Sequence, residues 1–329
     1  MKNPEKNFTI VIPSRDIDYN TRFCIKKIRF FYKKIKIIVI IDFQKNFYFS
    51  DKNIKIIYYK TKNIGLKRNY AVNFVKTKFI SFIDSDAYPV TPWLDYIFLN
   101  FDRKTKIVGG PNISNCNDIY ERIVSRVRNF WFVNFFNTEI NKINLHTGKY
   151  VKFLPSCNFS ILRSFYVKIK GMDENLEAGE EHKLFYYCQK NNIKVYFNPK
   201  SFVMHQERKV KEFFFQRMVY GQNILRLFSR YPSLNTFFMF LGLFPIIFLI
   251  LSLYSFFYKS HFEIILTIIS ILFFYFLFCL IKINKQKRFI IYSTKVLLAA
   301  VLGPGLGFFL SFGGVISLNW IYLQGKIKN

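Results

Sequence analysis

The stretch Phe79-Ile80-Ser81-Phe82-Ile83-Asp84-Ser85-Asp86 decides the fold that the sequence predicts. Its first five residues are apolar or small, which is typical of a strand buried on both faces of a parallel sheet. Similar runs precede it at Phe8 to Ile12, Ile35 to Ile41 and Ile54 to Tyr58, with amphipathic stretches between them. This alternation indicates βαβ units, so we predict an α/β domain with a mostly parallel sheet.

Polar residues follow three of these predicted strands directly. They are Pro13-Ser14-Arg15, Asp42 and Asp84-Ser85-Asp86. In an open parallel sheet, ligands bind at the carboxyl ends of the strands, where the strand order reverses. Two carboxylates on that rim suit a Mg²⁺ or Mn²⁺ ion bound to a diphosphate, because such an ion needs only one or two protein carboxylates.

The chain divides into a charged front and a back with few charges. It has 329 residues, of which 51% are hydrophobic, and a formal net charge of +29. Residues 233–329 hold only 8 of the 49 basic residues and 1 of the 20 acidic residues. This composition excludes a disordered, collagen-like or disulfide-rich chain and disfavours a wholly soluble protein.

The high positive charge does not by itself indicate nucleic-acid binding. Lys, Ile, Phe, Asn and Tyr are abundant together, which resembles a genome-wide compositional bias. No RNP aromatic pair, GXXG clamp or zinc-finger spacing accompanies the charge. We therefore expect no nucleic-acid partner, and instead a basic face toward anionic lipid or a phosphorylated substrate. The five cysteines lie tens of residues apart, without a C-x-x-C pair, and are predicted to be reduced core thiols.

Two apolar runs near the C-terminus carry no charge and are long enough to cross a bilayer. Phe237 to Phe257 has 21 residues and Ile264 to Ile281 has 18, close to the roughly 20 that a spanning helix needs. Basic residues flank the outer end of each run, which predicts that both ends are cytoplasmic. Because Gly303-Pro304-Gly305 divides the last apolar stretch, we predict an interfacial helix over Phe289 to Leu302 and a third span over Leu306 to Leu323.

These features predict three parts of the chain. The α/β domain covers residues 1–207, amphipathic interface helices cover 208–235, and a membrane region with two or three spans covers 236–329. The first residues lack the pattern of a secretory signal. We therefore expect a multi-pass protein of the cytoplasmic membrane whose α/β domain faces the cytoplasm.

Short motifs follow one another in order over roughly residues 8–225. They are Lys67-Arg68-Asn69, Phe82 to Pro89, Gly109-Gly110-Pro111, Cys157 to Arg163, Gly171 to Glu174, Gly179-Glu180-Glu181, Tyr196 to Pro199, His205-x-x-Arg208 and Tyr220-Gly221. Together they resemble the family 2 glycosyltransferases, which are inverting enzymes of the GT-A fold. The resemblance implies a nucleotide-diphosphate sugar as donor.

The resemblance also implies roles on the donor side. Asp42 would lie by the nucleotide base and Asp84 by the ribose or the metal, while Asp86, joined by His205, would hold the Mg²⁺ or Mn²⁺ that bridges the diphosphate. Such an ion neutralises the charge that develops on the leaving group. The full predicted donor site is Pro13, Ser14, Arg15, Asp42, Lys67, Arg68, Asp84, Ser85 and Asp86.

The predicted general base departs from the family pattern. Glu181 stands where the family has the Asp of a Glu-Asp pair, which deprotonates the acceptor hydroxyl and contributes about 10² to 10⁴ in rate. Here the pair is Glu180-Glu181. Two alternatives follow: Glu180 is the base instead, or the site is slow or inactive.

Each of these residues also has a purely structural interpretation. Asp42 could cap a helix, and His205 could be a core histidine. Lys67 and Arg68 could belong to a solvated basic face. The Glu180-Glu181 pair could interact favourably with the macrodipole at the N-terminus of a helix after Gly179, which is compatible with catalysis.

Basic residues beside bulky aromatics suggest the source of the acceptor. The stretches Ile119 to Ile140 and Phe213 to Tyr231 have this composition, which is typical of helices in the headgroup zone of a membrane as well as of ordinary core helices. We expect them to contact membrane lipids and to admit a lipid-linked acceptor of the polyprenyl type. The predicted acceptor-side residues are Asn158, Arg208, Arg217 and Tyr220.

The sequence thus predicts a membrane-bound, metal-dependent hexosyltransferase that acts on a lipid-linked or membrane glycan of the cell envelope. We expect it to be non-processive, because Gln216 is followed directly by Arg217 and the Q-x-x-R-W signature is absent. One alternative is a polyprenyl-phosphate glycosyltransferase that loads the carrier lipid itself. Another is an inactive membrane scaffold that only binds nucleotide.

Overall fold

The computed structural model describes residues 3–43, 49–129, 148–233 and 289–312, with short pieces between residues 236 and 282. The chain forms two compact units. The first, here called the sheet unit, joins Met1–Asn115 to Glu139–Gln206. The second, the helical unit, joins Cys116–Thr138 to Glu207–Asn329. The division into residues 1–207, 208–235 and 236–329 stays a prediction.

The sheet unit alternates strands and helices. Its strands are β1 (Phe8–Pro13), β2 (Lys36–Ile41), β3 (Ile54–Tyr58), β4 (Phe79–Ile83), β5 (Ala87–Pro89), β6 (Thr105–Gly109), β7 (Asn112–Asn115), β8 (Lys149–Val151), β9 (Asn158–Leu162), β10 (Lys194–Phe197) and β11 (Val203–Gln206). Its helices are α1 (Pro4–Asn7), α2 (Tyr19–Phe31), α3 (Ile64–Val72), α4 (Trp93–Leu99), α7 (Arg163–Lys168) and α8 (His182–Lys190). The four strands expected from the sequence are all present.

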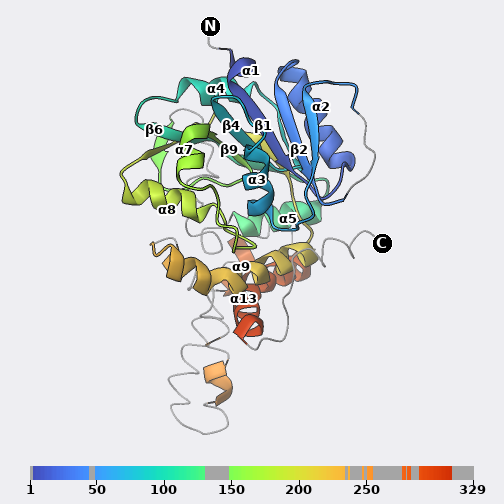
Figure 1. The fold of residues 1–329 in the computed structure, drawn as a ribbon. Coiled ribbons are helices and arrows are strands. Elements are labelled where there is room, and N and C mark those ends of the chain that lie inside the picture. Colours follow the sequence, from blue (N-terminus) through green and yellow to red (C-terminus); the bar gives the residue numbers. More distant parts are fainter. Residues whose placement is uncertain are drawn as a thin grey trace. The chain divides into compact units, whose positions relative to one another are not determined.

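Eight strands form the central sheet in the order β3-β2-β1-β4-β9-β6-β10-β8. Strand β1 pairs in parallel with both β2 and β4, and Figure 1 shows these strands side by side. Strand β9 lies antiparallel between β4 and β6. The predicted mostly parallel sheet with helices is therefore confirmed. Because β2 and β3 lie on one side of β1 and β4 on the other, the strand order reverses at β1, where a ligand site is expected.

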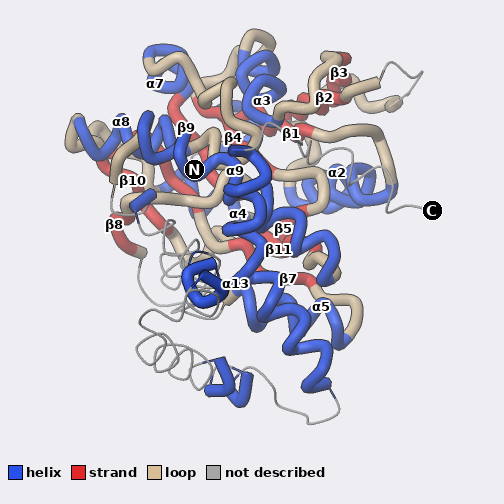
Figure 2. The backbone as a smooth tube through the Cα atoms, turned by 90° about the horizontal axis from the view of Figure 1, so that it is seen from below, coloured by secondary structure: helices blue, strands red, loops and turns tan. Residues whose placement is uncertain are grey.

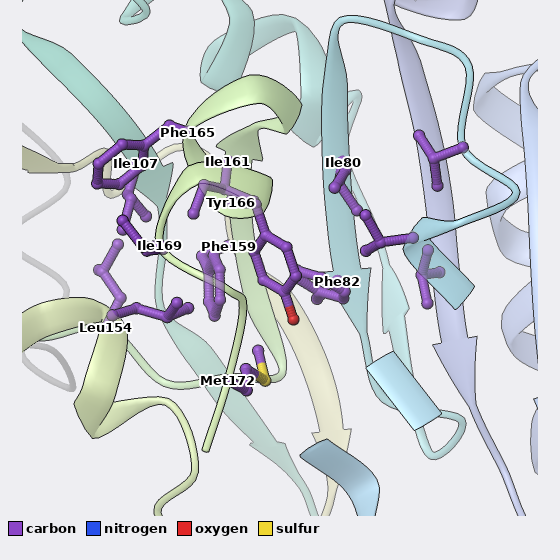
Figure 3. Close-up of a cluster of buried hydrophobic side chains, with 14 of the residues drawn as sticks. Ile80, Phe82, Ile107, Leu154, Phe159, Ile161, Phe165, Tyr166, Ile169 and Met172 are labelled. Atoms are coloured by element: carbon purple, nitrogen blue, oxygen red, sulfur yellow. The ribbon is translucent and has the colours of Figure 1, made fainter. Parts of the chain in front are cut away.

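Alternate residues of the strands supply two separate cores. Side chains of successive residues point to opposite faces, so Phe82 belongs to one cluster and Ile83 to the other. In the first cluster the rings of Phe82, Phe159 and Tyr166 pack together (Figure 3). Strands β1 and β4 are buried along their whole length. Because both faces of these two strands are buried, the strand ends that carry the polar residues are held in place.

A second, three-stranded sheet has the order β5-β11-β7, and Figure 2 shows its strands beside one another. Strand β11 is antiparallel to β5, with His205 opposite Ala87, and parallel to β7, with His205 opposite Ser114. Because β5 begins one residue after Asp86, this pairing brings His205 next to the acidic loop.

The helical unit contains α5 (Ile119–Arg128), α9 (Val210–Arg230) and α13 (Ile290–Phe312). Apolar side chains from the three helices form one core, which includes Val124, Phe213 and Val296. Glycines let α9 and α13 approach closely: a Cβ on Gly221 would lie 1.9 Å from the backbone oxygen of Pro304, and one on Gly307 would lie 1.9 Å from that of Met218.

The predicted division of the last apolar stretch at Gly303-Pro304-Gly305 is wrong. Helix α13 continues through Pro304 to Phe312. A proline inside a helix removes one backbone hydrogen bond, but small residues spaced four apart, here Gly303 and Gly307, allow dense helix packing. The continuous helix α13 therefore packs closely against α9. The interfacial helix and the third span predicted from the sequence share one helix up to residue 312.

Among the described residues, one helix is long and apolar enough to cross a membrane. It covers Ile290–Ser311, and about half of its most apolar stretch is buried inside the protein. A buried core helix of a soluble protein has the same properties, so this gives weak support for membrane association. Most of the predicted spans Phe237 to Phe257 and Ile264 to Ile281, and residues 313–323 of the third, lie outside the described residues.

Candidate active site

The first part of the site lies at the carboxyl ends of β1 and β2. Lys67, on α3, forms an ion pair with Asp42 and donates a hydrogen bond of 2.6 Å to the Ser14 carbonyl. Both charged side chains are buried, at 2% and 5% exposure. Burial raises the pKa of Asp42 and lowers that of Lys67, and the ion pair opposes each shift. The interpretation of Lys67 as part of a solvated face is therefore wrong.

The neighbouring residues are held by the backbone. Pro13 is the last residue of β1, and the Ser14 amide donates to the Ile40 carbonyl over 2.9 Å. The Asp42 amide donates to the carbonyl of Arg15 over 3.2 Å. The loops after β1 and β2 are thus tied to each other, and they place Arg15, Asp42 and Lys67 together as expected for one binding site.

The second part of the site is the acidic loop between β4 and β5. The Nε2 atom of His205 lies 3.4 Å from Oδ1 of Asp86 and 3.9 Å from Oδ2 of Asp84. The Gln206 amide donates to the Asp86 carbonyl over 3.0 Å, which joins the loop to β11. Ser85 lies half-buried in the turn between the two carboxylates. The structure therefore brings together the three metal ligands expected from the sequence.

The ring orientation of His205 suits a metal ligand. Its Nδ1 atom lies 2.9 Å from the carbonyl of Gln206, so Nδ1 carries the proton and donates it to that oxygen. The other ring nitrogen, Nε2, faces the carboxylates, and a histidine whose Nδ1 donates to a backbone carbonyl is common at metal sites. His205 is buried, as a core histidine would be, but its Nε2 faces the carboxylates of Asp84 and Asp86.

Cys157 is a neighbour that the sequence analysis missed. One donor atom from each of Asp84, Cys157 and His205 lies within 4.8 Å of the other two. The sequence predicts only a reduced core thiol here, because Cys157 belongs to no C-x-x-C pair. The available signal was its position directly before Asn158, at the start of the motif Cys157 to Arg163.

Arg68 connects the acidic loop to the glutamate pair. Its Nη2 donates to Oδ1 of Asp84 over 2.6 Å, and its Nη1 donates to Oε1 of Glu180 over 2.5 Å. The Arg68 side chain is 1% exposed, so Arg68 does not belong to a solvated face. Its two carboxylate partners offset the cost of burying the guanidinium.

Glu180 and Glu181 lie side by side before α8 and are both buried. Burial raises the pKa of both carboxylates, and the pKa of Glu180 reaches about 7 with the charge of Glu181 as a further cause. Glu181 occupies the N-cap position of α8, but its side chain caps no backbone amide. The pair thus lies at the start of α8, but the Glu181 carboxylate does not cap the helix.

The predicted acceptor-side residues do not all fall in the sheet unit. Asn158 is fully buried, and its amide donates to the carbonyls of Pro111 and Ser201, which is a structural environment. Arg208, Arg217 and Tyr220 belong to the helical unit. Within that unit the Arg217 guanidinium lies 5.8 Å from the ring centre of Tyr220. Their acceptor role stays a prediction.

The donor set at the acidic loop fits a divalent cation. Two carboxylates, an imidazole nitrogen and a thiol converge there. The guanidinium of Arg68 pairs with Oδ1 of Asp84 and with Glu180, whereas His205 lies by Oδ2 of Asp84. Asp84, Asp86 and His205 would hold Mg²⁺ or Mn²⁺, and the buried glutamate pair supplies a base on the other side of Arg68. This arrangement can activate a leaving phosphate and accept a proton.

Sequence comparison connects this arrangement to a known activity. Over 236 residues the chain is 22% identical to the pre-mycofactocin glycosyltransferase of Mycobacterium tuberculosis, in strains CDC 1551 / Oshkosh and ATCC 25618 / H37Rv. The chain is homologous to a glycosyltransferase. The matched part is 69% of this chain and 49% of the relative, so the chain spans about half the length of the curated relatives it matches. No protein-family model matches the sequence.

Two solved structures that resemble the chain are complexes with a nucleotide or a nucleotide sugar. The mannosyltransferase PcManGT from Pyrobaculum calidifontis, in complex with GDP-Man and Mn²⁺, is 9% identical, with a TM-score of 0.49 over 98% of this chain and 80% of that chain. TarS 1-349 of S. aureus in complex with UDP is 14% identical, with a TM-score of 0.44 over 67% of this chain and 65% of that chain.

Proposed function

We propose that this chain is an inverting glycosyltransferase of the family 2 type that moves a hexosyl group from a nucleotide-diphosphate donor to a hydroxyl of a membrane-linked acceptor. The observation that carries the proposal is the buried Arg68, which links a metal-binding carboxylate, Asp84, to the Glu180-Glu181 pair. This link supports a leaving-group site and a base site that lie next to each other. Homology to a glycosyltransferase supports the same reaction class.

The donor side follows from the two polar parts of the site. Asp42 and Lys67, with the Ser14 and Arg15 loop, would bind the nucleoside. Asp84, Asp86 and His205 would hold Mg²⁺ or Mn²⁺ on the diphosphate. When bound, the cation stabilises the negative charge on the departing diphosphate. Burial of Asp42, Lys67 and His205 lowers the local dielectric constant and strengthens their electrostatic interactions.

Glu181 is the better candidate for the base. Glu180 already accepts a charge-assisted hydrogen bond from Arg68, whereas no basic side chain in the described part of the chain forms an ion pair with Glu181. Glu181 would remove the acceptor hydroxyl proton as that oxygen bonds to the sugar carbon and the bond to the diphosphate breaks. The raised pKa makes the carboxylate a stronger base than an exposed glutamate.

The membrane-linked acceptor is supported by composition and by one helix. Residues 233–329 have few charges, and α13 is apolar over a length that could span a bilayer. We propose that the sheet unit faces the cytoplasm and that the polyprenyl part of the acceptor lies in the membrane. Arg208, Arg217 and Tyr220 would then meet the acceptor, and transfer would be non-processive.

A donor screen with Mn²⁺ or Mg²⁺ tests the proposal. Sugar-nucleotide hydrolysis and transfer would be measured for the wild-type chain, Asp86→Ala and Glu181→Gln. We expect metal-dependent turnover that Asp86→Ala abolishes, and donor binding without transfer in Glu181→Gln. Nucleotide binding with no metal-dependent turnover in the wild type would instead indicate a scaffold. Preference for bare polyprenyl phosphate over an oligosaccharide-lipid would indicate loading of the carrier.

A further inference from the structure

The strand pairing brings a thiol to the acidic loop. In the antiparallel pair of β4 and β9, Ile83 lies opposite Asn158. The next residue of one strand, Asp84, and the preceding residue of the other, Cys157, therefore leave the sheet together at the same edge. This placement is a property of the sheet register and does not depend on a flexible loop.

The position of Cys157 is also fixed by its surroundings. The residue is 5% exposed, and its Sγ accepts a hydrogen bond of 3.3 Å from the side-chain amide of Asn112, on β7. A donor directed at a sulfur stabilises negative charge on it, and such outer contacts orient ligands around a metal. Asn112 pairs with β11 at Val203, two residues before His205. The same small sheet thus orients both the thiol and the imidazole.

The distances are those of donors around one ion. Two nitrogen or oxygen ligands bound to a small cation at about 2.1 Å lie about 3.0 to 3.4 Å apart. His205 Nε2 and Asp86 Oδ1 are 3.4 Å apart. The Cys157 sulfur lies within 4.8 Å of both the imidazole and an Asp84 oxygen. Because a metal–sulfur bond is longer, at about 2.3 Å, a sulfur ligand lies farther from the other donors around an ion than a nitrogen or oxygen ligand does.

We propose that Cys157 is a direct ligand of the divalent ion held by Asp84, Asp86 and His205, and that it makes the site prefer softer ions, such as Co²⁺, Zn²⁺ and Cd²⁺, over Mg²⁺. Thiolate and imidazole ligands select borderline and soft metals, whereas an all-oxygen site suits Mg²⁺. This inference rests on the proposed function, because the ion is the one that would bridge the donor diphosphate. In this proposal the thiol determines which ion binds. A site of carboxylates without the thiol would bind Mg²⁺ or Mn²⁺.

Absorption spectroscopy of the purified full-length chain with Co²⁺ tests the assignment without any turnover. We expect the wild type to show a near-ultraviolet thiolate-to-cobalt charge-transfer band. Cys157→Ser and Cys157→Ala should lose this band while they still bind Co²⁺ through the remaining ligands. Cys188→Ser is the matched control, since Cys188 is also a buried thiol, on α8, and lies outside the donor cluster. Circular dichroism would verify that each variant is folded.

Competition between ions gives a second readout. We expect the preference for Cd²⁺ over Mg²⁺ to fall at least about tenfold in Cys157→Ser and to stay unchanged in Cys188→Ser. A wild-type chain that binds Co²⁺ without the charge-transfer band would overturn the role of Cys157 and leave the proposed function intact. A charge-transfer band that persists in both Cys157 variants would likewise overturn the role of Cys157 and leave the proposed function intact. Failure of the wild type to bind any divalent ion would overturn both proposals.

Discussion

The guanidinium of Arg68 donates a hydrogen bond of 2.5 Å to the carboxylate of Glu180, in a position where the arginine side chain is almost completely buried. The second arm of the same guanidinium holds Asp84 at 2.6 Å. One side chain therefore joins the two glutamates proposed for the general base to the proposed metal ligands.

Replacement of Arg68 by Met is expected to destabilise the chain. The change leaves the carboxylates of Glu180 and Asp84 without their cation, and removal of one partner of a buried ion pair costs about 3 to 5 kcal/mol. Urea unfolding followed by circular dichroism measures the loss. Arg68→Lys keeps the charge but cannot donate to both partners, so it should lose less stability. Equal stability of Arg68→Met and the wild type would contradict this account.

Replacement of Asp86 by Ala is expected to reduce metal-dependent turnover by about a hundredfold or more, since a bound cation supplies several kcal/mol of charge stabilisation. The measurement is the initial rate over a Mn²⁺ titration, together with Mn²⁺ affinity. Glu177→Ala serves as the control, because Glu177 is an exposed acid of the same unit. The assignment fails if Asp86→Ala keeps the wild-type affinity for Mn²⁺.

The two neighbouring glutamates should respond differently to replacement by Gln. Glu181→Gln is expected to lower the transfer rate by about 10² to 10⁴ with donor affinity unchanged. Glu180→Gln keeps a group that can accept the Arg68 hydrogen bond, so it should lower the rate less. Single-turnover transfer and donor titration distinguish the two effects. The reverse order of severity would move the base to Glu180.

The transfer rate is expected to fall as the pH is lowered. A base must be deprotonated to act, and burial raises the pKa of Glu181 and takes that of Glu180 to about 7. The pair titrates together, so half of the activity should be lost at a pH clearly above 4.5, the ordinary value of a glutamate. In Glu180→Gln the neighbouring negative charge is gone, which should shift the profile to lower pH. A profile flat down to pH 4.5 would contradict the assignment.

Replacement of Gly221 by Ala is expected to loosen the helical unit. The new Cβ would lie 1.9 Å from the Pro304 carbonyl oxygen, and insertion of a group into a dense contact costs about 1 to 3 kcal/mol. Protease sensitivity of α9 and α13 measures the effect. Leu298→Ala, at a 42% exposed position of α13, should leave the cleavage pattern unchanged. Wild-type resistance in Gly221→Ala would show that the helices do not depend on this contact.

Local sequence patterns predicted the strands and the residues at their ends. The apolar runs that became β1, β2 and β4 are buried almost throughout, so their composition identified them. Strand β3 is buried only at Ile57, and its β-branched residues identified it. The same logic placed Asp42 and Asp84 on one rim. Burial of Lys67 and Arg68 was not predictable from composition, because in a chain with 49 basic residues a buried cation looks like any other.

Contacts made by distant strands were missed. Cys157 reaches Asp84 only because β9 inserts antiparallel between β4 and β6, and no local pattern encodes that order. The continuity of α13 through Pro304 was missed for a related reason: the proline signals a break locally, while packing of Gly303 and Gly307 against α9 acts over a long sequence separation.

The register that sets Ile83 opposite Asn158 also has a thermodynamic consequence. The donor atoms of Asp84 and Cys157 come from chain positions more than seventy residues apart, so an unfolded chain offers no comparable set. An ion that binds only the native arrangement raises the free energy of unfolding by RT ln(1 + [L]/Kd). Thermal denaturation should therefore shift upward with ion concentration, and the shift reports whether these two strands have paired.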